Sequence, residues 1–490
     1  MFATVAWMVL SGGCERARSV SDRQSDKDVG HEENVTMPSS TSRLDVNVAN
    51  TETAHAVDLA GIEWFEDDLA GATARAISTI PSKPLLVDMW ASWCHTCLSM
   101  RQTVLRDAAL ATYADKFVWL ALDTERSENA ELVQKLNMSM WPTFYVLDPA
   151  DQSVQAVFAG GASVEQFGGF LADGRASFRA KQGGRDAVID EAQRWMRRAA
   201  SAVAAKSFDE AEAALVRALA LAPEAWSRRP EALVELIRVR YKQEAFDRCA
   251  ALVSESMDAV MQSKSASVTD FTVYGSRCLK ALPTADRERA LRQMIAGLVK
   301  LEGDSGARLS VDDRSDLLYN LRGLYEALKD IPAARTTAVR QRDLLMRAAK
   351  AARSPREAMI YAWPRAEVHV YLDEAASLEP ELVALYEALP EEYDPPYRLG
   401  WLRMQGGDFR GAVGPLERAL SRVYGPRKAK VWSLLADAYG KLGDGVRELQ
   451  AREGIVAHLR ALPAGLGNET LESQAIEALR AARKRLTATR

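Results

Sequence analysis

Cysteine and histidine, the residues that most often form metal and redox sites, are scarce in this chain. Its 490 residues include five of each. A structural zinc site takes four ligands, commonly from two cysteine or histidine pairs, whereas the sequence has one closely spaced cysteine pair, Cys94 and Cys97. Attachment of a c-type haem needs a histidine directly after the second cysteine, and Leu98 stands there. We therefore expect neither a metal nor another cofactor.

Long apolar runs and an excess of one charge are also missing. No run reaches the roughly 18 apolar residues of a membrane-spanning helix, so an ordinary membrane span is not expected. The 63 Lys and Arg residues nearly balance the 67 Asp and Glu residues, and no basic patch stands out, so nucleic acid is not an expected partner. Apolar residues make up 48% of the chain, which is ample for folded cores, and its length predicts more than one domain.

Aromatic residues are absent from 15–56, where Ser, Asp, Glu, Asn and Thr dominate. Such a segment cannot bury enough apolar surface to fold, so we expect a disordered linker there. Before it, an apolar stretch over Phe2–Leu10 and small residues lead to Cys14. The segment 1–14 resembles a bacterial lipoprotein signal with Cys14 as the lipidated residue, although no Lys or Arg precedes the apolar stretch. An ordinary signal peptide or a frayed terminus is the alternative.

The cysteine pair follows an apolar segment, Leu85-Leu86-Val87, and a Trp-Ala-Ser-Trp turn. A buried strand that leads into two cysteines at the start of a helix is typical of a dithiol redox centre. The positive end of the helix favours the thiolate of Cys94, which is then the attacking nucleophile. Cys97, one turn further on, is expected to resolve the mixed disulfide. An inert structural disulfide is the alternative.

Two neighbours of the pair are candidates to assist it. His95 adds positive charge beside Cys94 when its ring is protonated. Asp88 ends the apolar run, and burial there is expected to raise its pKa, which suits it to accept the Cys97 proton through water. The alternative for Asp88 is an acid that is merely paired with a cation.

The surrounding residues predict alternating strands and helices. Strands are expected over 117–123, 140–148 and 154–158, a short apolar start and an amphipathic helix over 62–80, and a helix over 127–136. Ser127 is the expected cap of the 127–136 helix, and Ser163 with Gln166 predicts a capping box for a last helix.

This order of elements resembles the thioredoxin fold over residues 57–180. The resemblance rests on WASWC-x-x-C, on an acid five residues before Trp93, and on a proline that opens the strand after the second helix. It implies that Cys94 is the nucleophile, Cys97 the resolving thiol and Asp88 the buried acid. It also implies that Pro142 is a cis proline beside the disulfide, next to backbone that binds an extended peptide. Within the family, these stretches look most like the periplasmic thioredoxin-like domain of the reductant transporter DsbD.

The sequence departs from the family pattern at two places. His95 and Thr96 stand between the cysteines in place of Gly-Pro, which leaves the direction of electron flow open. Trp141, before the proline, is larger than the usual residue. With Trp93 it would form an aromatic lip around Cys94, or else it packs on the sheet. Trp93, His95, Trp141 and Pro142 are the expected substrate-binding residues.

Residues 185–490 lack strand signals and show helical spacing of apolar residues. They resemble a degenerate tetratricopeptide-like array, which predicts an all-α solenoid after the α/β domain. The pattern is carried by Trp195, Ala199, Phe208, Ala211, Leu215, Ala218 and Pro223, and again by Leu399, Gly400, Gly407, Phe409, Ala412, Leu416 and Ala419.

The remaining cysteines and two of the histidines fall in this helical region. Cys249 occupies a small-residue position of the repeat and is expected to be a core thiol, and Cys278 is expected to be buried on a helix. A Cys249–Cys278 disulfide is the less favoured alternative. His369 and His458 stand alone on predicted helices and are expected to be surface or core residues rather than metal ligands.

These features predict a thiol-disulfide oxidoreductase of the bacterial cell envelope or periplasm that acts on protein disulfides. Its expected partners are client proteins with disulfides or thiols, which the helical repeats recruit, and an upstream thiol that donates or accepts electrons. Contact with a membrane is expected only through lipid on Cys14. The alternative is a protein-binding scaffold whose thioredoxin domain is a redox sensor or is vestigial, but a scaffold gains nothing from Asp88.

Overall fold

The computed structural model describes residues 62–138, 140–183, 191–224, 226–304, 306–307 and 309–488. The predicted signal with Cys14 and the predicted linker over 15–56 lie outside these residues. The domain boundaries drawn from the sequence stay predictions. Below, the sheet domain means residues 62–183 and the helical region means residues 191–488.

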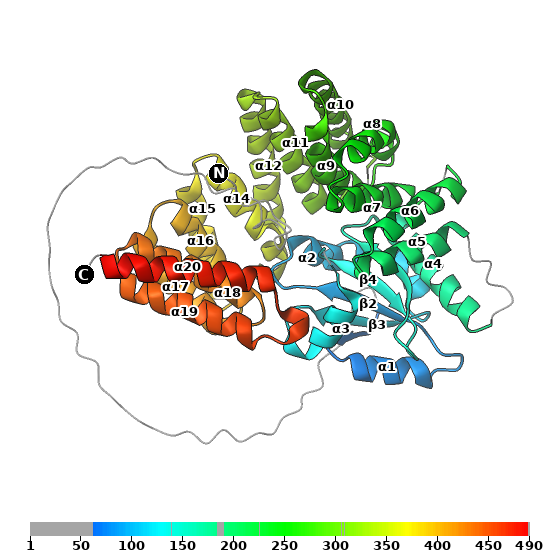
Figure 1. The fold of residues 1–490 in the computed structure, drawn as a ribbon, viewed down its shortest axis with the longest axis horizontal. Coiled ribbons are helices and arrows are strands. Elements are labelled where there is room, and N and C mark those ends of the chain that lie inside the picture. The colour runs from blue at the N-terminus through cyan, green and yellow to red at the C-terminus, as the bar shows by residue number, and fades with distance from the viewer. Residues whose placement is uncertain are drawn as a thin grey trace. The chain divides into compact units, whose positions relative to one another are not determined.

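The sheet domain is built on a five-stranded sheet with the strand order β1-β3-β2-β4-β5 (Figure 1). Its strands are β1 (Trp64–Glu66), β2 (Leu85–Trp90), β3 (Val118–Asp123), β4 (Thr143–Leu147) and β5 (Val154–Ala159). β1, β3 and β2 run parallel, and β4 is antiparallel to both β2 and β5. Every residue of β3 and β4 is buried, which is the pattern of strands with both faces covered.

Helices cover the two faces of this sheet. Leu86 and its neighbours on one face pack with α2 (His95–Gln102) and α4 (Val164–Lys181). Val87, which points to the opposite face, packs with α1 (Leu69–Ser78) and α3 (Ala130–Leu136). The alternation along β2 therefore places α2, which carries the cysteines, on one defined face.

The local predictions for the sheet domain hold at most positions. The expected strands are present, β1 and α1 lie within 62–80, and the capping box of Ser163 and Gln166 forms at α4. The prediction that Ser127 caps a helix is wrong. Ser127 begins a short 3₁₀ turn, η4 (Ser127–Asn129), and its hydroxyl donates to Glu128 instead. Asn129 precedes α3 but its side chain donates to Asp67 and to the Asp123 carbonyl.

The helical region consists of helices throughout its described residues. The first eight are α5 (Glu191–Ala204), α6 (Phe208–Leu221), α7 (Arg229–Lys242), α8 (Phe246–Gln262), α9 (Ser267–Cys278), α10 (Thr284–Glu302), α11 (Val311–Ala327) and α12 (Ile331–Ala351). The rest are α13 (Pro355–Ala358), α14 (Ala362–Tyr371), α15 (Ala375–Ala388), α16 (Asp394–Gln405), α17 (Phe409–Arg422), α18 (Arg427–Lys441), α19 (Gly445–Ala461) and α20 (Glu469–Ala488). None of the described helices is long and apolar enough to cross a membrane.

Successive helices pair as hairpins, most closely in α5 with α6, α11 with α12, α16 with α17, and α18 with α19. Small residues allow the close approach. A Cβ atom at Gly400 on α16 would lie 2.6 Å from Leu416 Cγ on α17, too close for an alanine without a shift. The predicted fold class, an α/β domain followed by an all-α array of helical pairs, is confirmed.

Cys249 and Cys278 are buried as expected, but they are not separate thiols, so the less favoured alternative is the correct one. The two residues form a disulfide that joins α8 to α9, with their Cα atoms 5.6 Å apart and both side chains buried. Their separation of 29 positions hides this proximity in the sequence.

The helical region contacts the sheet domain at several points. α2 contacts α11 and the 3₁₀ turn η6 (Met359–Tyr361), while α5 contacts β5. Near the far end of the chain, η7 (Ala464–Leu466) contacts α3. A Cβ atom at Gly465 would lie 2.0 Å from the Ala130 carbonyl oxygen, so glycine is required for that contact.

Candidate redox site

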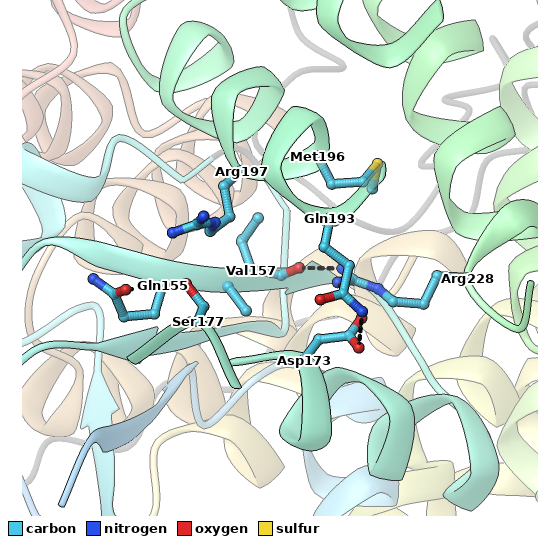
Figure 2. A pocket seen from close by; sticks show the side chains of 9 residues that line it. Gln155, Val157, Asp173, Ser177, Gln193, Met196, Arg197 and Arg228 are labelled. Atoms are coloured by element: carbon cyan, nitrogen blue, oxygen red, sulfur yellow. Dashed lines mark hydrogen bonds and ion pairs between the residues drawn. The ribbon is translucent and has the colours of Figure 1, made fainter. Parts of the chain in front are cut away.

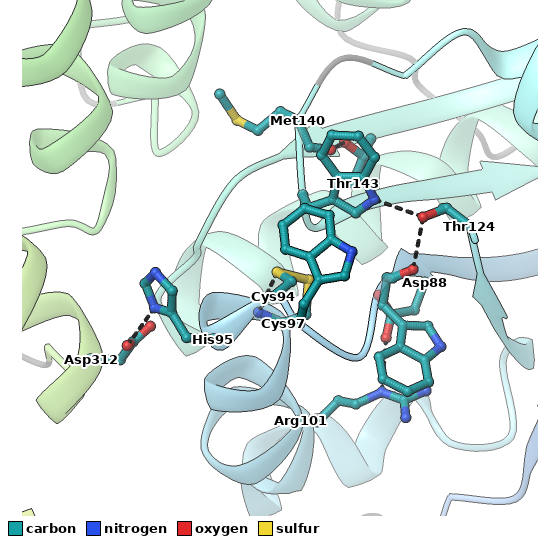
Figure 3. The surroundings of a disulfide bond; sticks show 12 residues. Asp88, Cys94, His95, Cys97, Arg101, Thr124, Met140, Thr143 and Asp312 are labelled. Atoms are coloured by element: carbon teal, nitrogen blue, oxygen red, sulfur yellow. Dashed lines mark hydrogen bonds and ion pairs between the residues drawn. A yellow bond between two sulfur atoms is a disulfide. The ribbon is translucent and has the colours of Figure 1, made fainter. Parts of the chain in front are cut away.

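Cys94 and Cys97 form a disulfide at the start of α2, with an S–S distance of 2.05 Å (Figure 3). Cys94 is the N-cap of the helix, and its sulfur accepts the backbone N–H of Cys97 at 3.0 Å. The unpaired N–H groups and the helix dipole therefore act on Cys94 Sγ, as its predicted role as a nucleophile requires. Cys94 is 5% exposed and Cys97 is 2% exposed.

Asp88 is buried in β2, and burial raises the pKa of its carboxyl group. The direction agrees with the prediction, but an opposing cation lowers the pKa in part. Arg101 Nε donates to Asp88 Oδ2 at 3.2 Å, and the same guanidinium lies over the Trp90 ring. Asp88 Oδ1 is buried and has no hydrogen-bond partner in the described part of the chain. Asp88 is thus both a paired acid and an acid with one oxygen free to take a proton.

Arg101 is a site residue that the sequence reasoning missed. It also donates to Glu66 on β1 at 3.3 Å. The signal for it is its spacing, because Arg101 follows Cys97 by four residues and so shares its face of α2.

Trp93, just before α2, and Trp141, just before β4, both pack against the disulfide. Their ring centroids are 5.3 Å apart, and with Trp90 they pack around Cys94 and Cys97. Trp141 Nε1 donates to Thr124 Oγ1 at 2.8 Å, and the bond to Pro142 is cis, as the resemblance implied. The geometry is that of an aromatic lip, whereas the role of these residues in substrate binding stays a prediction.

The helical region holds Trp93 by its ring and its backbone. Trp93 Nε1 donates to Glu125 at 2.9 Å, and Glu125 also accepts the backbone N–H of Arg427 on α18 at 2.7 Å. The Arg427 guanidinium carbon lies 5.0 Å from the centroid of the Trp93 ring. Arg398 on α16 donates to the Trp93 carbonyl at 3.4 Å. Burial raises the pKa of Glu125 to about 7, although the hydrogen bonds from Trp93 and Arg427 oppose it.

His95 is paired with an acid of the helical region. Its Nδ1 lies 2.8 Å from Asp312 Oδ1 on α11 (Figure 3). Burial disfavours the charged ring, but the charges of Asp312 and Asp316 outweigh burial and raise the pKa of His95 to about 9. The raised pKa favours a protonated ring, which agrees with the positive charge predicted beside Cys94. Asp312 pairs with that charge and partly neutralises it. The nearest ligand-type atoms of His95, Asp312 and Asp316 lie within 4.8 Å of one another.

A small pocket lies away from the disulfide, between β5, α4 and α5 (Figure 2). Arg228 closes one side of it by donating to the Val157 carbonyl at 2.8 Å and pairing with Asp173 and Glu231. The empty space is about 250 Å³ even when open solvent is counted, below the size of typical small-ligand pockets. The pocket contains none of the predicted site residues.

Comparison with known proteins identifies the sheet domain. Residues 63–149 match the thioredoxin-like family, so this part of the chain is a thioredoxin-like domain with a Cys-x-x-Cys pair. No curated protein matches the chain. Similar solved structures include a tetratricopeptide repeat protein from Parabacteroides merdae, with 11% identity over 60% of this chain and 98% of that one, at a TM-score of 0.37. The C-terminal part of a repeat protein from Cytophaga hutchinsonii has 15% identity over 58% and 98%, at a TM-score of 0.31.

Proposed function

We propose that the protein is a thiol-disulfide oxidoreductase that acts through Cys94 and Cys97. One observation carries the proposal: the two sulfur atoms form a disulfide at a helix N-terminus, with Cys94 as the capping residue. A nearby buried acid with an unpaired oxygen is what the resolving step requires.

In the reduced protein, the Cys94 thiolate attacks one sulfur of a client disulfide, and the other client sulfur leaves as a thiolate. A mixed disulfide joins Cys94 to the client. Cys97 then loses its proton to Asp88, through water, and attacks Cys94 Sγ. The second client thiolate leaves, so that the client gains two electrons and the protein is left with the Cys94–Cys97 disulfide. The reverse sequence oxidises a client dithiol.

Turnover of a peptide disulfide, with a dithiol reductant in excess, tests this proposal. Wild type is expected to turn over, and Cys94→Ser is expected to be inactive because the attacking thiolate is gone. The matched control is the double variant Cys249→Ser and Cys278→Ser, which removes the other disulfide and keeps the dithiol. If neither the folded wild type nor the folded control turned over the peptide, the proposed oxidoreductase activity would be refuted.

The reduction potential of the Cys94–Cys97 pair decides whether electrons pass from the protein to its client or from the client to the protein. Dithiol centres range from about −270 mV for reductants to about −120 mV for strong oxidants. Equilibration of the Cys94–Cys97 pair with glutathione buffers, read by alkylation and mass, places this protein on that range. A value near the first end assigns a reductase and a value near the second an oxidant.

We further propose that the protein works in the bacterial cell envelope, with Cys14 as a lipid attachment site. The Cys249–Cys278 disulfide supports this location, because buried structural disulfides are rare in reducing cytosol. Expression in a bacterial host, followed by membrane fractionation and mass measurement of the mature N-terminus, tests it. We expect the mature wild-type protein to carry the added mass of a lipid and the Cys14→Ala variant to lack it. An unprocessed chain in the cytosol would contradict the proposed location.

The helical repeats are proposed to serve as the client-binding or controlling part of the enzyme. A second candidate function is a redox-sensing scaffold. It is favoured by the direct contacts of α16 and α18 with Trp93. A shift of Trp93 on oxidation or reduction of the dithiol would change these contacts and so affect the helices. Identical proteolysis patterns of the oxidised and reduced protein, together with measurable turnover, would eliminate the sensor.

A further inference from the structure

A second group of chemically capable side chains lies where α2 meets α11. His95 is the first residue of α2, and Asp312 and Asp316 lie near the start of α11. The two acids are four residues apart, so they share one face of the helix. Ligand-type atoms of the three residues all lie within 4.8 Å of one another.

Asp312 has an oxygen that lacks a partner. Its side chain is 1% exposed, and Oδ1 lies 2.8 Å from His95 Nδ1. Its second oxygen, Oδ2, is buried and makes no hydrogen bond to any residue that the structure describes. A buried carboxylate oxygen without a donor is costly unless a cation or a donor reaches it.

Acidic side chains outnumber the imidazole at this place. Asp312, Asp313 and Asp316 stand close to His95, the single imidazole among them. Asp313 accepts from the Ser310 backbone N–H and hydroxyl, so its carboxylate is already used within α11. The two other acids, Asp312 and Asp316, have ligand-type oxygens near His95.

We propose that His95, Asp312 and Asp316 bind a divalent cation of the zinc class. One imidazole nitrogen and two carboxylate oxygens are ligands that zinc accepts, and three protein ligands leave a fourth position for water. Zinc lies about 2.0–2.2 Å from such ligands, so the three side chains need to rotate inward. The metal takes the place of the His95–Asp312 hydrogen bond and joins the redox helix to α11.

Zinc binding to the full chain tests the proposal without measuring activity. The protein is stripped with a chelator, kept oxidised and alkylated, so that free thiols contribute no ligand. Titration with Zn²⁺ in a calorimeter is expected to give one site per chain. Asp316→Asn and His95→Gln are each expected to weaken binding at least about tenfold, because even the mutation of a residue that only supports a metal ligand costs about 10–100-fold in affinity.

Asp313→Asn is the matched control. It makes the same Asp-to-Asn change in the same helix but leaves the three ligands, and Asn can still accept from Ser310. Its affinity is expected to stay within about twofold of wild type. Equal weakening by Asp313→Asn and Asp316→Asn, or no saturable binding by wild type, would overturn the site.

X-ray absorption at the zinc edge of the wild-type complex covers the case in which Asp316→Asn does not fold. Nitrogen and oxygen ligands without sulfur are expected. A sulfur ligand would mean that zinc sits at cysteine instead, and it would refute the proposal. Failure of peptide-disulfide turnover leaves this result unaffected, because the oxidised dithiol takes no part.

Discussion

At the residue scale, Asp88 combines burial, an ion pair and one unpaired oxygen. Burial raises its pKa while Arg101 lowers it, and the balance decides whether the carboxylate can accept the Cys97 proton at neutral pH. Glu66 shares Arg101 but lies on β1, and burial raises its pKa too. Both acids pair with Arg101, but only Asp88 is assigned to the Cys97 proton. Substituting each acid in turn therefore separates the effect of proton transfer from the effect of the ion pair.

Asp88→Asn is expected to slow resolution of the mixed disulfide by about 10²–10⁴-fold, the usual contribution of a general base. Initial attack by Cys94 should change much less, because Asp88 is assigned to the Cys97 proton. Acid quenching and trapping of the mixed disulfide measure both steps. Glu66→Gln is the control and should leave both rates nearly unchanged. Equal slowing of the two steps by Asp88→Asn would contradict the base role.

Glu125 makes the stability of the fold depend on pH. Its pKa of about 7 in the folded protein exceeds the model-peptide value of 4.5, so the folded state holds this proton more tightly. The free energy of unfolding should therefore fall as the pH rises from about 4.5 to about 7. The contribution of Glu125 is on the order of 1–3 kcal/mol.

Urea unfolding at a series of pH values measures this slope. Glu125→Gln, which cannot ionise, should show a flatter dependence in that window. Glu128→Gln is the control, because Glu128 is an exposed neighbour on η4 and should leave the slope as it is. A wild-type slope retained in full by Glu125→Gln would disprove the assignment.

At the scale of elements, glycine at helix contacts sets how closely the hairpins pack. Gly400 on α16 faces Leu416 on α17, while Gly414 on α17 has no atom within 4 Å of its hypothetical Cβ. Gly400→Ala is expected to destabilise the protein by about 1–3 kcal/mol through overpacking. Gly414→Ala is expected to be neutral or stabilising by up to about 1 kcal/mol, because alanine favours helix. Thermal unfolding of both variants tests this, and an equally stable Gly400→Ala would be contrary to it.

Elements were predictable where the signal is local. The apolar run before Cys94, the Ser163–Gln166 box and the repeat pattern each act within a few residues, and the structure has them. The prediction that Ser127 caps a helix failed because residues 127–129 form the 3₁₀ turn η4, so that α3 begins only at Ala130.

At the scale of the whole molecule, several contacts of the site that sequence reasoning missed, unlike that of Arg101, come from far along the chain. His95 meets Asp312 across 217 residues, and Glu125 meets Arg427 across 302. No periodicity or motif encodes such pairs, since they depend on how the helical array closes on the sheet domain. The Cys249–Cys278 bridge was only the less favoured alternative for the same reason, at a shorter range.

A substitution at Arg427 tests whether the contact between α18 and Trp93 restricts access to the dithiol. Arg427→Ala removes a cation over Trp93, worth about 1 kcal/mol, which corresponds to roughly a fivefold larger population of locally open protein. Reduction of the Cys94–Cys97 disulfide by a protein thiol is expected to accelerate by that factor, as followed by tryptophan fluorescence. Arg410→Ala, on α17, is the control. Unchanged rates in Arg427→Ala would show that the contact does not restrict access.

The order of synthesis adds a consequence of the Glu125–Arg427 contact. A chain emerges N-terminus first, at about 5–20 residues per second, so the 302 residues that separate these partners take roughly 15–60 s to follow. Throughout that interval the contacts of Arg398 and Arg427 with Trp93 cannot form. The surroundings of the cysteine pair are therefore complete only after α18, one of the last helices of the chain, has been made.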